Sequence, residues 1–229
     1  MKISTATQSS SAETILDAAE KVFAELGYEG ASMRQIAETA DIAQALLHYH
    51  FRTKEGLYEA VFERRSTVIN AQRLQLLNAL FTNRPSPTIE DVLKTYFEPV
   101  MSDSGAGNAA FAQMVASLTL GSDERAAKLI TKYYDPIARE YIAAFQKTVP
   151  CLDGGMAVWA YLMALGARTH ISSVSKRAER LSGGRCDTSD FNRTMPILVE
   201  FVAAGIKALS SGATRQRNKR GRPVKAGRA

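Results

Sequence analysis

The sequence predicts an all-α protein of about nine helices, on the basis of three observations. Apolar residues recur at spacings of three and four along most of the 229 residues, which is the period of an amphipathic helix. No stretch shows the strict alternation of apolar and polar residues that marks a half-buried strand. Serine and threonine stand where the helical patterns begin, and segments rich in glycine and proline separate them.

Four helices are predicted in the first 80 residues. Ser10 with Glu13, and Ser32 with Gln35, have the spacing of a capping box, which satisfies backbone groups at the start of a helix. Gly27 is the residue type that most often follows the end of a helix. The predicted helices cover residues 10–26, 32–40, 43–49 and 53–80, with a tight turn at Asp41 and with Thr53 at the start of the fourth.

Five further helical stretches are predicted in the rest of the chain, over residues 88–101, 108–120, 122–147, 153–179 and 190–211. Polar loops separate them at 82–87, 102–108, 149–155 and 181–190. No apolar run reaches the ~20 residues needed to span a bilayer. The first residues are polar and lack the apolar segment of a secretory signal, so we expect a cytoplasmic protein, associated with the nucleoid if it binds DNA.

Residues 32–51 show the pattern of a helix-turn-helix, in which a turn joins two short helices. The second helix of such a unit enters the major groove of DNA. Its outer face carries Gln44, Ala45, His48 and Tyr49. Glutamine can form two hydrogen bonds with adenine, and alanine can contact the methyl group of thymine. The positions expected to pack against the first helix are Ile36, Ala37, Ala40, Ile42 and Leu47.

The segment from Thr14 to Leu57 resembles the N-terminal domain of the TetR (tetracycline-repressor) family of transcription regulators. The matching residues are Ile15, Leu16, Ala18, Ala19, Phe23, Gly27, Tyr28, Ile36, Ala37, Ala40, Leu47, His48, Tyr49, His50, Phe51, Lys54, Glu55 and Leu57. The resemblance implies a flexible N-terminus over 1–10, a three-helix DNA-binding domain over 11–55, and a helical effector-binding and dimerisation domain over 56–211. It also implies a regulator, so we expect no enzymatic activity, no cofactor and no metal.

The resemblance assigns roles to residues of the DNA-binding domain. By resemblance, Ser32, Arg34 and Lys54 contact phosphates, Gln44 and Ala45 face bases, His48 lies on the same surface, and Tyr49 and His50 position the recognition helix on the DNA backbone. The alternative leaves His48 and His50 as core or surface imidazoles without a DNA role.

Two positions depart from the family pattern. Asp41 stands where the family usually has glycine, and aspartate enters the left-handed backbone region more easily than most residues. Ala43 stands where the family often has serine or threonine, and loss of such a cap typically costs ~1 kcal/mol and removes a phosphate contact. Both departures bear on DNA affinity rather than on the fold.

Two apolar stretches near the C-terminus, 153–179 and 190–211, are expected to form a homodimer, as the corresponding helices do in the TetR family. Their apolar residues are Met156, Val158, Trp159, Leu162, Met163 and Leu165, and Phe191, Met195, Leu198, Val199, Phe201, Val202 and Ile206. The alternative is that these helices only bury a core within one chain.

An unknown small-molecule effector is expected to bind among the body helices. The candidate residues are Phe97, Met101, Phe111, Met114, Tyr134, Tyr141, Trp159, Met163, Arg168 and His170. Aromatic residues and methionines at helical spacing are also ordinary core, which is the alternative. Arg168 and His170 stand in an otherwise apolar stretch, where they could receive an anionic ligand or pair with a nearby acid.

The net charge of +6 is concentrated at the C-terminus. Residues 213–229 hold seven basic residues and no acid, so residues 1–212 carry a net charge of −1, and residues 1–65 alone carry −3. Arg220, Gly221, Arg222 and Pro223 resemble an AT-hook core, in which Arg-Gly-Arg lies in a narrow minor groove. We expect residues 212–229 to be a disordered basic tail that attracts DNA; the alternative is a merely solvated tail.

These features together predict a repressor that binds a palindromic operator in double-stranded DNA as a homodimer and is released by a small molecule. The alternative is an architectural DNA-binding protein led by its basic tail. Enzyme motifs such as HExxH, GxSxG and the P-loop are absent, and no strand precedes the GxGxxG-like run at 105–110. Cys151 and Cys186 are expected to be reduced thiols rather than a redox-sensing pair.

Removal of residues 213–229 should flatten the salt dependence of DNA binding. Each basic residue that neutralises a phosphate contributes about 0.9 to the slope of log K against log salt concentration. The measurement is the Kd of full-length and truncated protein for one labelled duplex between about 50 and 200 mM salt. An unchanged slope would show that the tail makes no phosphate contact.

Overall fold

The computed structural model describes residues 5–101, 106–121, 123–172 and 176–220, and within these it contains eleven α-helices and no strand. The all-α fold class is confirmed. The helices are α1 (Thr5–Gly30), α2 (Met33–Thr39), α3 (Gln44–His50), α4 (Lys54–Asn83), α5 (Ile89–Met101), α6 (Ala106–Leu120), α7 (Glu124–Tyr133), α8 (Asp135–Thr148), α9 (Gly154–Ser172), α10 (Arg177–Ser182) and α11 (Phe191–Arg220).

Several helix boundaries differ from the predicted ones. The predicted helix over 122–147 is two helices, because Pro136 in the first turn of α8 has no amide hydrogen to continue the hydrogen bonds of α7. The stretch predicted over 153–179 is divided between α9 and α10. Helix α1 begins at Thr5 rather than at Ser10, since no glycine or proline interrupts the chain before Gly27. Helix α11 continues to Arg220, past the predicted end at residue 211.

The other local signals in the first 55 residues are confirmed, but the capping box predicted at Ser10 and Glu13 is wrong, because Ser10 lies inside α1. Gly27 has φ 70° and ψ 174°, so it breaks the helical geometry within α1. The side chain of Ser32 accepts a hydrogen bond from the amide of Gln35, and that of Thr53 accepts one from Gly56, so both residues cap their helices. Asp41 adopts φ 52°, the left-handed conformation that the tight turn between α2 and α3 requires.

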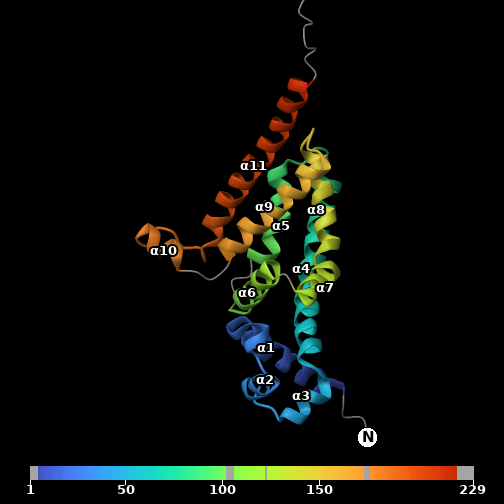
Figure 1. Ribbon diagram of the computed structural model, residues 1–229, viewed down its shortest axis with the longest axis vertical. Coiled ribbons are helices and arrows are strands. Elements are labelled where there is room, and N and C mark those ends of the chain that lie inside the picture. Colours follow the sequence, from blue (N-terminus) through green and yellow to red (C-terminus); the bar gives the residue numbers. More distant parts are fainter. Residues whose placement is uncertain (1–4, 102–105, 122, 173–175, 221–229) are drawn as a thin grey trace, which may run out of the picture.

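Two hydrophobic cores lie one above the other along the long axis of the molecule (Figure 1). The head core joins α1, α2 and α3 to the first half of α4, and to Phe111, Met114, Val115, Leu118, Ala126 and Leu129 of α6 and α7. The body core contains the second half of α4 together with α5, α8, α9 and α11. The predicted inward positions Ile36, Ala37, Ala40 and Leu47 are buried in the head core.

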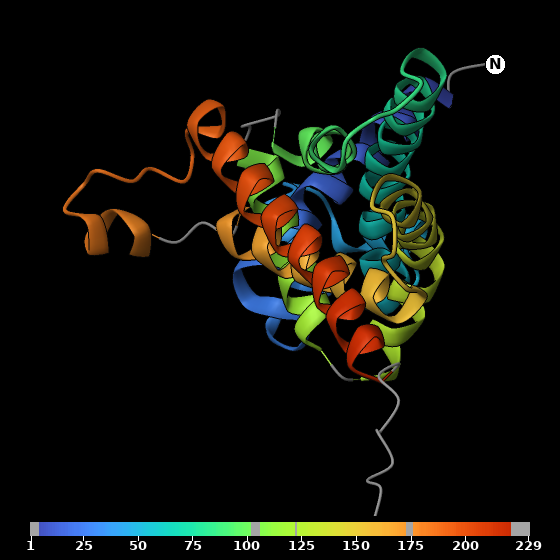
Figure 2. The ribbon, with the colours of Figure 1, turned by 90° about the horizontal axis from the view of Figure 1, so that it is seen from above.

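The head therefore shares its core with part of the body. Helix α6 packs directly on α1 and also contacts α9, and α4 runs without interruption from the head into the body. At the end of the molecule away from the head, α11 lies against α5 and α9, and α10 projects to one side (Figure 2). A displacement of α6 would consequently act on the head through a hydrophobic contact rather than through a flexible linker.

A buried carboxylate fixes α1 to α4 beside this core. The Glu20 side chain is 4% exposed, and it accepts hydrogen bonds from Arg64 at 3.2 Å and from Arg65 at 3.0 Å. Arg64 also binds the more exposed carboxylates of Glu13 and Asp17, each at 2.9 Å. Both arginines are thus used to hold the head together.

The variant Glu20→Gln should lower the free energy of unfolding by about 2 kcal/mol, because it leaves two partly buried guanidinium groups without their shared carboxylate. For a chain of this length, the midpoint of thermal unfolding should fall by about 5 °C. The matched control is Glu13→Gln, since Glu13 also pairs with Arg64 but is 59% exposed. The stabilities are measured by calorimetry. If the two variants were equally stable, Glu20 would not be the residue that fixes α1 to α4.

Candidate DNA-binding surface and ligand cavity

The recognition helix predicted from the sequence is α3, which lies at the end of the molecule farthest from α11 (Figure 1). Leu47 is buried and holds α3 on the head core. Gln44, Ala45 and His48 are exposed, and Tyr49 is 69% exposed. The structure thus gathers four of the predicted base- and backbone-facing residues on one solvent-facing surface.

The two histidines of α3 differ in their surroundings. The Nε2 atom of His48 lies 3.5 Å from Nε2 of Gln44, one helical turn away, on the exposed surface. His50 packs its ring edge-on against Tyr49 at 5.4 Å and lies 6.4 Å from the ring of Phe51. Its Nε2 atom is buried and has no hydrogen-bond partner. His48 can therefore meet DNA directly, whereas His50 is held in the packing at the end of the helix.

Most basic side chains of the head are engaged within the protein. Lys54 donates hydrogen bonds to the carbonyl oxygens of Tyr28 at 2.8 Å and Ala31 at 3.1 Å, so it anchors the end of α1 as well as being a predicted phosphate contact. Arg34 pairs with Glu38 at 2.8 Å, but both side chains are more than half exposed and the pair is easily broken.

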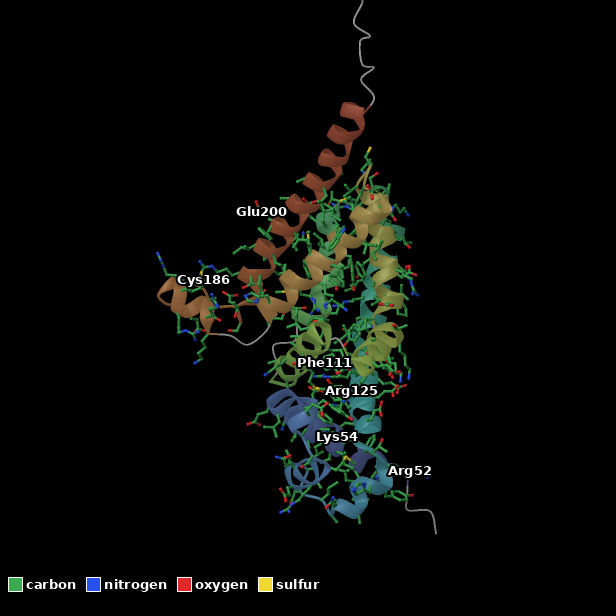
Figure 3. The ribbon with its side chains drawn as sticks, viewed as in Figure 1. Arg52, Lys54, Phe111, Arg125, Cys186 and Glu200 are labelled. Atoms are coloured by element: carbon green, nitrogen blue, oxygen red, sulfur yellow. The ribbon has the colours of Figure 1, made fainter. Side chains whose placement is uncertain are left out.

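Arg52, which sequence reasoning did not select, is exposed and has no ion pair among the described residues. It lies between α3 and α4 at the same end of the molecule as Lys54 (Figure 3). Its position two residues after the end of α3 is the feature of the sequence that could have identified it as a candidate phosphate contact.

Helix α7 reaches the head through Arg125. Its guanidinium carbon lies 3.4 Å from the centre of the Tyr28 ring, and the group binds Glu29 at 3.1 Å and Asp123 at 3.0 Å. The ammonium of Lys54 lies 4.3 Å from the centre of the same ring. Tyr28, which matches the family pattern, thus connects α1, α4 and α7.

The structure distributes the candidate effector residues over several sites. Phe97, Met101 and Tyr141 are fully buried in the body core, and Met114 is buried in the head core. Trp159 and Met163 are more than half exposed on the outer side of α9, and His170 is exposed near the end of that helix.

Three of these residues do meet in one cavity, namely Phe111, Tyr134 and Arg168. Its volume is about 20 Å³, and its other lining residues are Ser66, Ile69, Asn70, Arg73, Val100, Ala112 and Val115. Arg73 is a second buried guanidinium, which sequence reasoning missed because it stands in a polar stretch of α4.

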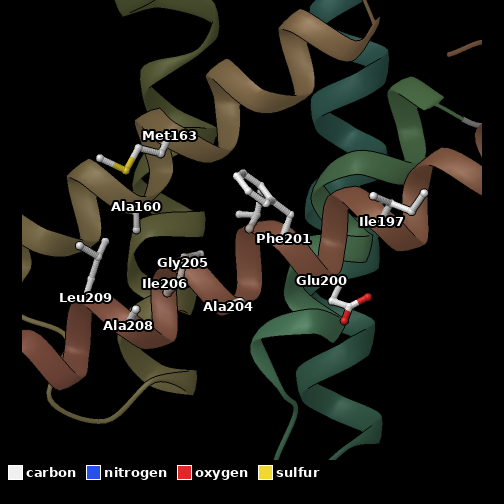
Figure 4. A pocket seen from close by; sticks show the side chains of 11 residues that line it. Ala160, Met163, Ile197, Glu200, Phe201, Ala204, Gly205, Ile206, Ala208 and Leu209 are labelled. Atoms are coloured by element: carbon white, nitrogen blue, oxygen red, sulfur yellow. The ribbon is translucent and has the colours of Figure 1, made fainter. Parts of the chain in front are cut away.

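A wide apolar groove of about 780 Å³ lies between α9 and α11 (Figure 4). It is lined by Ala160, Met163, Ile197, Glu200, Phe201, Val202, Ala204, Gly205, Ile206, Ala208 and Leu209. Phe201 is 74% exposed and Ile197 is 61% exposed. Such a continuous exposed apolar surface marks an interaction site.

Other parts of the described chain bear on the remaining predictions. Cys151 and Cys186 are both free and exposed. Among the described residues, no group of three or more potential metal ligands occurs and no helix is long and apolar enough to cross a membrane. The AT-hook-like residues lie outside the described residues, apart from the backbone of Arg220 at the end of α11.

The chain matches two family models. Residues 15–61 match the model of bacterial regulatory proteins of the tetR family, and residues 93–205 match the tetracyclin repressor-like C-terminal domain. The first match covers the head and the beginning of α4. The second covers most of the body, including the cavity beside Arg168 and the groove on α9 and α11.

Curated relatives resemble the N-terminal part of the chain. The transcriptional activator FasR of Mycolicibacterium smegmatis is 31% identical over 39% of this chain and 40% of its own length. The negative regulator IcaR of the biofilm operon in Staphylococcus aureus is 40% identical over 20% of this chain and 25% of its own length. The chain therefore matches less than half of the length of these relatives.

A solved structure resembles nearly the whole chain. The transcriptional regulator FadR from Bacillus subtilis, in complex with stearoyl-CoA, superposes with a TM-score of 0.56 at 16% identity, covering 84% of this chain and 98% of its own. This likeness shows a common fold. The two family models, which together match most of the chain, show that it belongs to the TetR family of bacterial transcriptional regulators, which are not enzymes.

Proposed function

We propose that this chain is a repressor that binds a palindromic DNA operator as a homodimer and leaves it when a small molecule binds in the body. The observation that carries the proposal is the pair of exposed surfaces at opposite ends of the molecule. One is the polar outer face of α3, and the other is the apolar groove on α9 and α11.

The groove supports dimerisation through a second copy of the same chain. Phe201, Ile197 and Met163 are each more than half exposed, which is unfavourable for a monomer in water. Apart from the adjacent backbone of α11 itself, no atom lies within 4 Å of where a Cβ of Gly205 would stand, so another backbone can approach closely there. A two-fold interface of this kind brings the same patch of both subunits together and directs both heads to one face of a duplex.

The head supports sequence-specific binding in the major groove. Gln44 and Ala45 would offer a hydrogen-bonding group and a methyl group to base edges, and the exposed side chains of Tyr49 and Arg52 would contact the phosphates that flank the groove. Two such helices in successive major grooves would read half-sites about 34 Å apart.

The small cavity supports release by a ligand. Phe111 and Val115 line the cavity and also belong to the head core, where α6 packs on α1. The cavity has room for about one water molecule. An organic ligand would therefore have to displace the surrounding helices, and displacement of α6 would change the position of the head. FasR is named an activator and IcaR a negative regulator, and FadR was solved with a bound acyl-CoA. We favour repression because this coupling disturbs the head when ligand binds.

The charge distribution favours a second candidate, an architectural protein led by its tail. Residues 1–65 carry a net charge of −3, whereas residues 213–229 carry seven basic residues. Non-specific attraction to DNA comes from cations that displace counterions. In this alternative the tail would dominate binding and the head would assist.

Selection of random duplex DNA by the full-length protein should return a palindrome with half-sites about one helical turn apart. The variant Gln44→Ala should relax base preference at one position of each half-site and cost about 1–3 kcal/mol for the preferred base. Arg52→Ala should weaken binding to all sequences alike and reduce the salt slope by about 1. Recovery of A/T-rich DNA without symmetry would support the tail-led alternative instead.

The variant Phe201→Glu should convert the dimer into a monomer and reduce operator affinity by at least about tenfold, because it places a charge in each copy of an apolar interface. Sedimentation velocity at several concentrations measures the change. Val68→Glu on α4 is the matched control, since Val68 is 57% exposed and lies outside the groove. If Val68→Glu dissociated the dimer and Phe201→Glu did not, the interface would lie elsewhere.

A further inference from the structure

Two arginines are buried in the body without an acidic partner among the described residues. Arg73 of α4 is 3% exposed and Arg168 of α9 is 5% exposed. Their guanidinium carbons lie 4.4 Å and 5.9 Å from the centre of the same ring, that of Tyr96. Burying a charge that has no counter-charge is costly, so two such groups around one ring call for a ligand or a partner.

The hydrogen bonds of both guanidinium groups are incomplete. Arg73 donates from Nε to the carbonyl of Tyr96 at 3.0 Å and from Nη1 to Asn70 at 3.3 Å, but its Nη2 atom has no partner. Arg168 donates from Nη2 to Thr169 at 3.4 Å, while its Nε atom is buried without a partner. Burial lowers the pKa of Arg73 from its ordinary value, and the positive charge of Arg168 lowers it further.

A third unused donor belongs to Tyr134, which precedes α8. Its hydroxyl is buried and has no hydrogen-bond partner, and it lines the same cavity as both arginines. Burial raises the pKa of this hydroxyl, so it keeps its proton and remains a donor. Three side chains from different parts of the chain therefore bring unused hydrogen-bond donors to one place.

The cavity is also lined by apolar side chains. Ile69, Val100, Phe111, Ala112 and Val115 line it together with the polar side chains. A neighbouring groove of about 390 Å³ shares Ser66 and Asn70 with the cavity and is otherwise lined by residues of α4, α7 and α8. Ser66 and Asn70, one turn apart on α4, thus line both the cavity and this groove.

We propose that this cavity binds a small organic carboxylate with an apolar body, held by Arg73, Arg168 and Tyr134. Guanidinium groups match a carboxylate with paired hydrogen bonds, and two positive charges offset the cost of burying one negative charge. The cavity of about 20 Å³ must widen to receive the rest of the molecule, and its apolar side chains then disfavour strongly hydrated inorganic anions. Binding itself is independent of the proposed repressor role, but the effect of the carboxylate on DNA rests on that role.

The test is thermal unfolding of the full-length protein with octanoate, benzoate and inorganic phosphate, and with octanol and benzamide as uncharged counterparts. At about 100 times its Kd, a bound carboxylate should raise the unfolding midpoint by about 5 °C. Octanol, benzamide and phosphate should have much smaller effects. Equal shifts with the charged and uncharged compounds, or no shift with either carboxylate, would overturn the proposal.

Variants separate a ligand-binding role of the arginines from a structural one. Arg168→Met should abolish the shift caused by the carboxylate and leave the free protein as stable as the original or more stable, because it removes an unpaired buried charge. Tyr134→Phe keeps the ring and should weaken carboxylate binding about fivefold to tenfold. Arg139→Met, at an exposed position of α8, is the matched control and should bind normally. The proposal would be wrong if Arg168→Met were less stable than the parent protein and the parent showed no thermal shift with either carboxylate. Groups of the protein would then stabilise the charge of Arg168 without a ligand.

A DNA-binding assay distinguishes this proposal from the proposed function. Saturating octanoate or benzoate should lower operator affinity at least tenfold in the parent protein and not in Arg168→Met. A carboxylate that binds without changing DNA affinity would leave the site intact and refute release by ligand. A selected palindrome with no carboxylate binding would refute the site and leave the DNA-binding role intact.

Discussion

The packing of α6 against α1 is the contact on which the rest of the arrangement depends. Without Phe111, Met114 and Val115, the head core would be open on one side and α1 would expose apolar surface. Because Phe111 and Val115 also line the cavity beside Arg168, α6 contributes both to the stability of the head and to the shape of the cavity. Cores of this kind repack between discrete arrangements rather than deform smoothly.

The charges of the head illustrate how position outweighs net charge. Arg64 and Arg65 are bound by Glu20, and Lys54 is bound by backbone carbonyl groups, so these cations stabilise the fold. Arg52 is left exposed at the end of the molecule that carries α3. An electrostatically modest head increases the relative weight of base contacts, since non-specific attraction grows with the number of phosphates neutralised.

The sequence predicted most of what depends on neighbouring residues and little of what depends on distant ones. The caps at Ser32 and Thr53 and the left-handed turn at Asp41 follow from local chemistry, and the structure confirms them. Arg168 stood out because its helix is otherwise apolar. Arg73 did not, because its burial comes from side chains of α5 and α9, which only the tertiary fold brings to α4. The division of apolar residues between two cores was hidden for the same reason.

The length of α4 has a mechanical consequence. Between Lys54 in the head and Arg73 at the cavity, the helix rises roughly 28 Å at 1.5 Å per residue. A tilt of about 5° around the cavity would therefore move the far end by roughly 2.5 Å, which is close to the full length of a hydrogen bond. In the proposed release by a ligand, α4 would therefore convert a small change in angle into a displacement large enough to take side chains out of register with base edges.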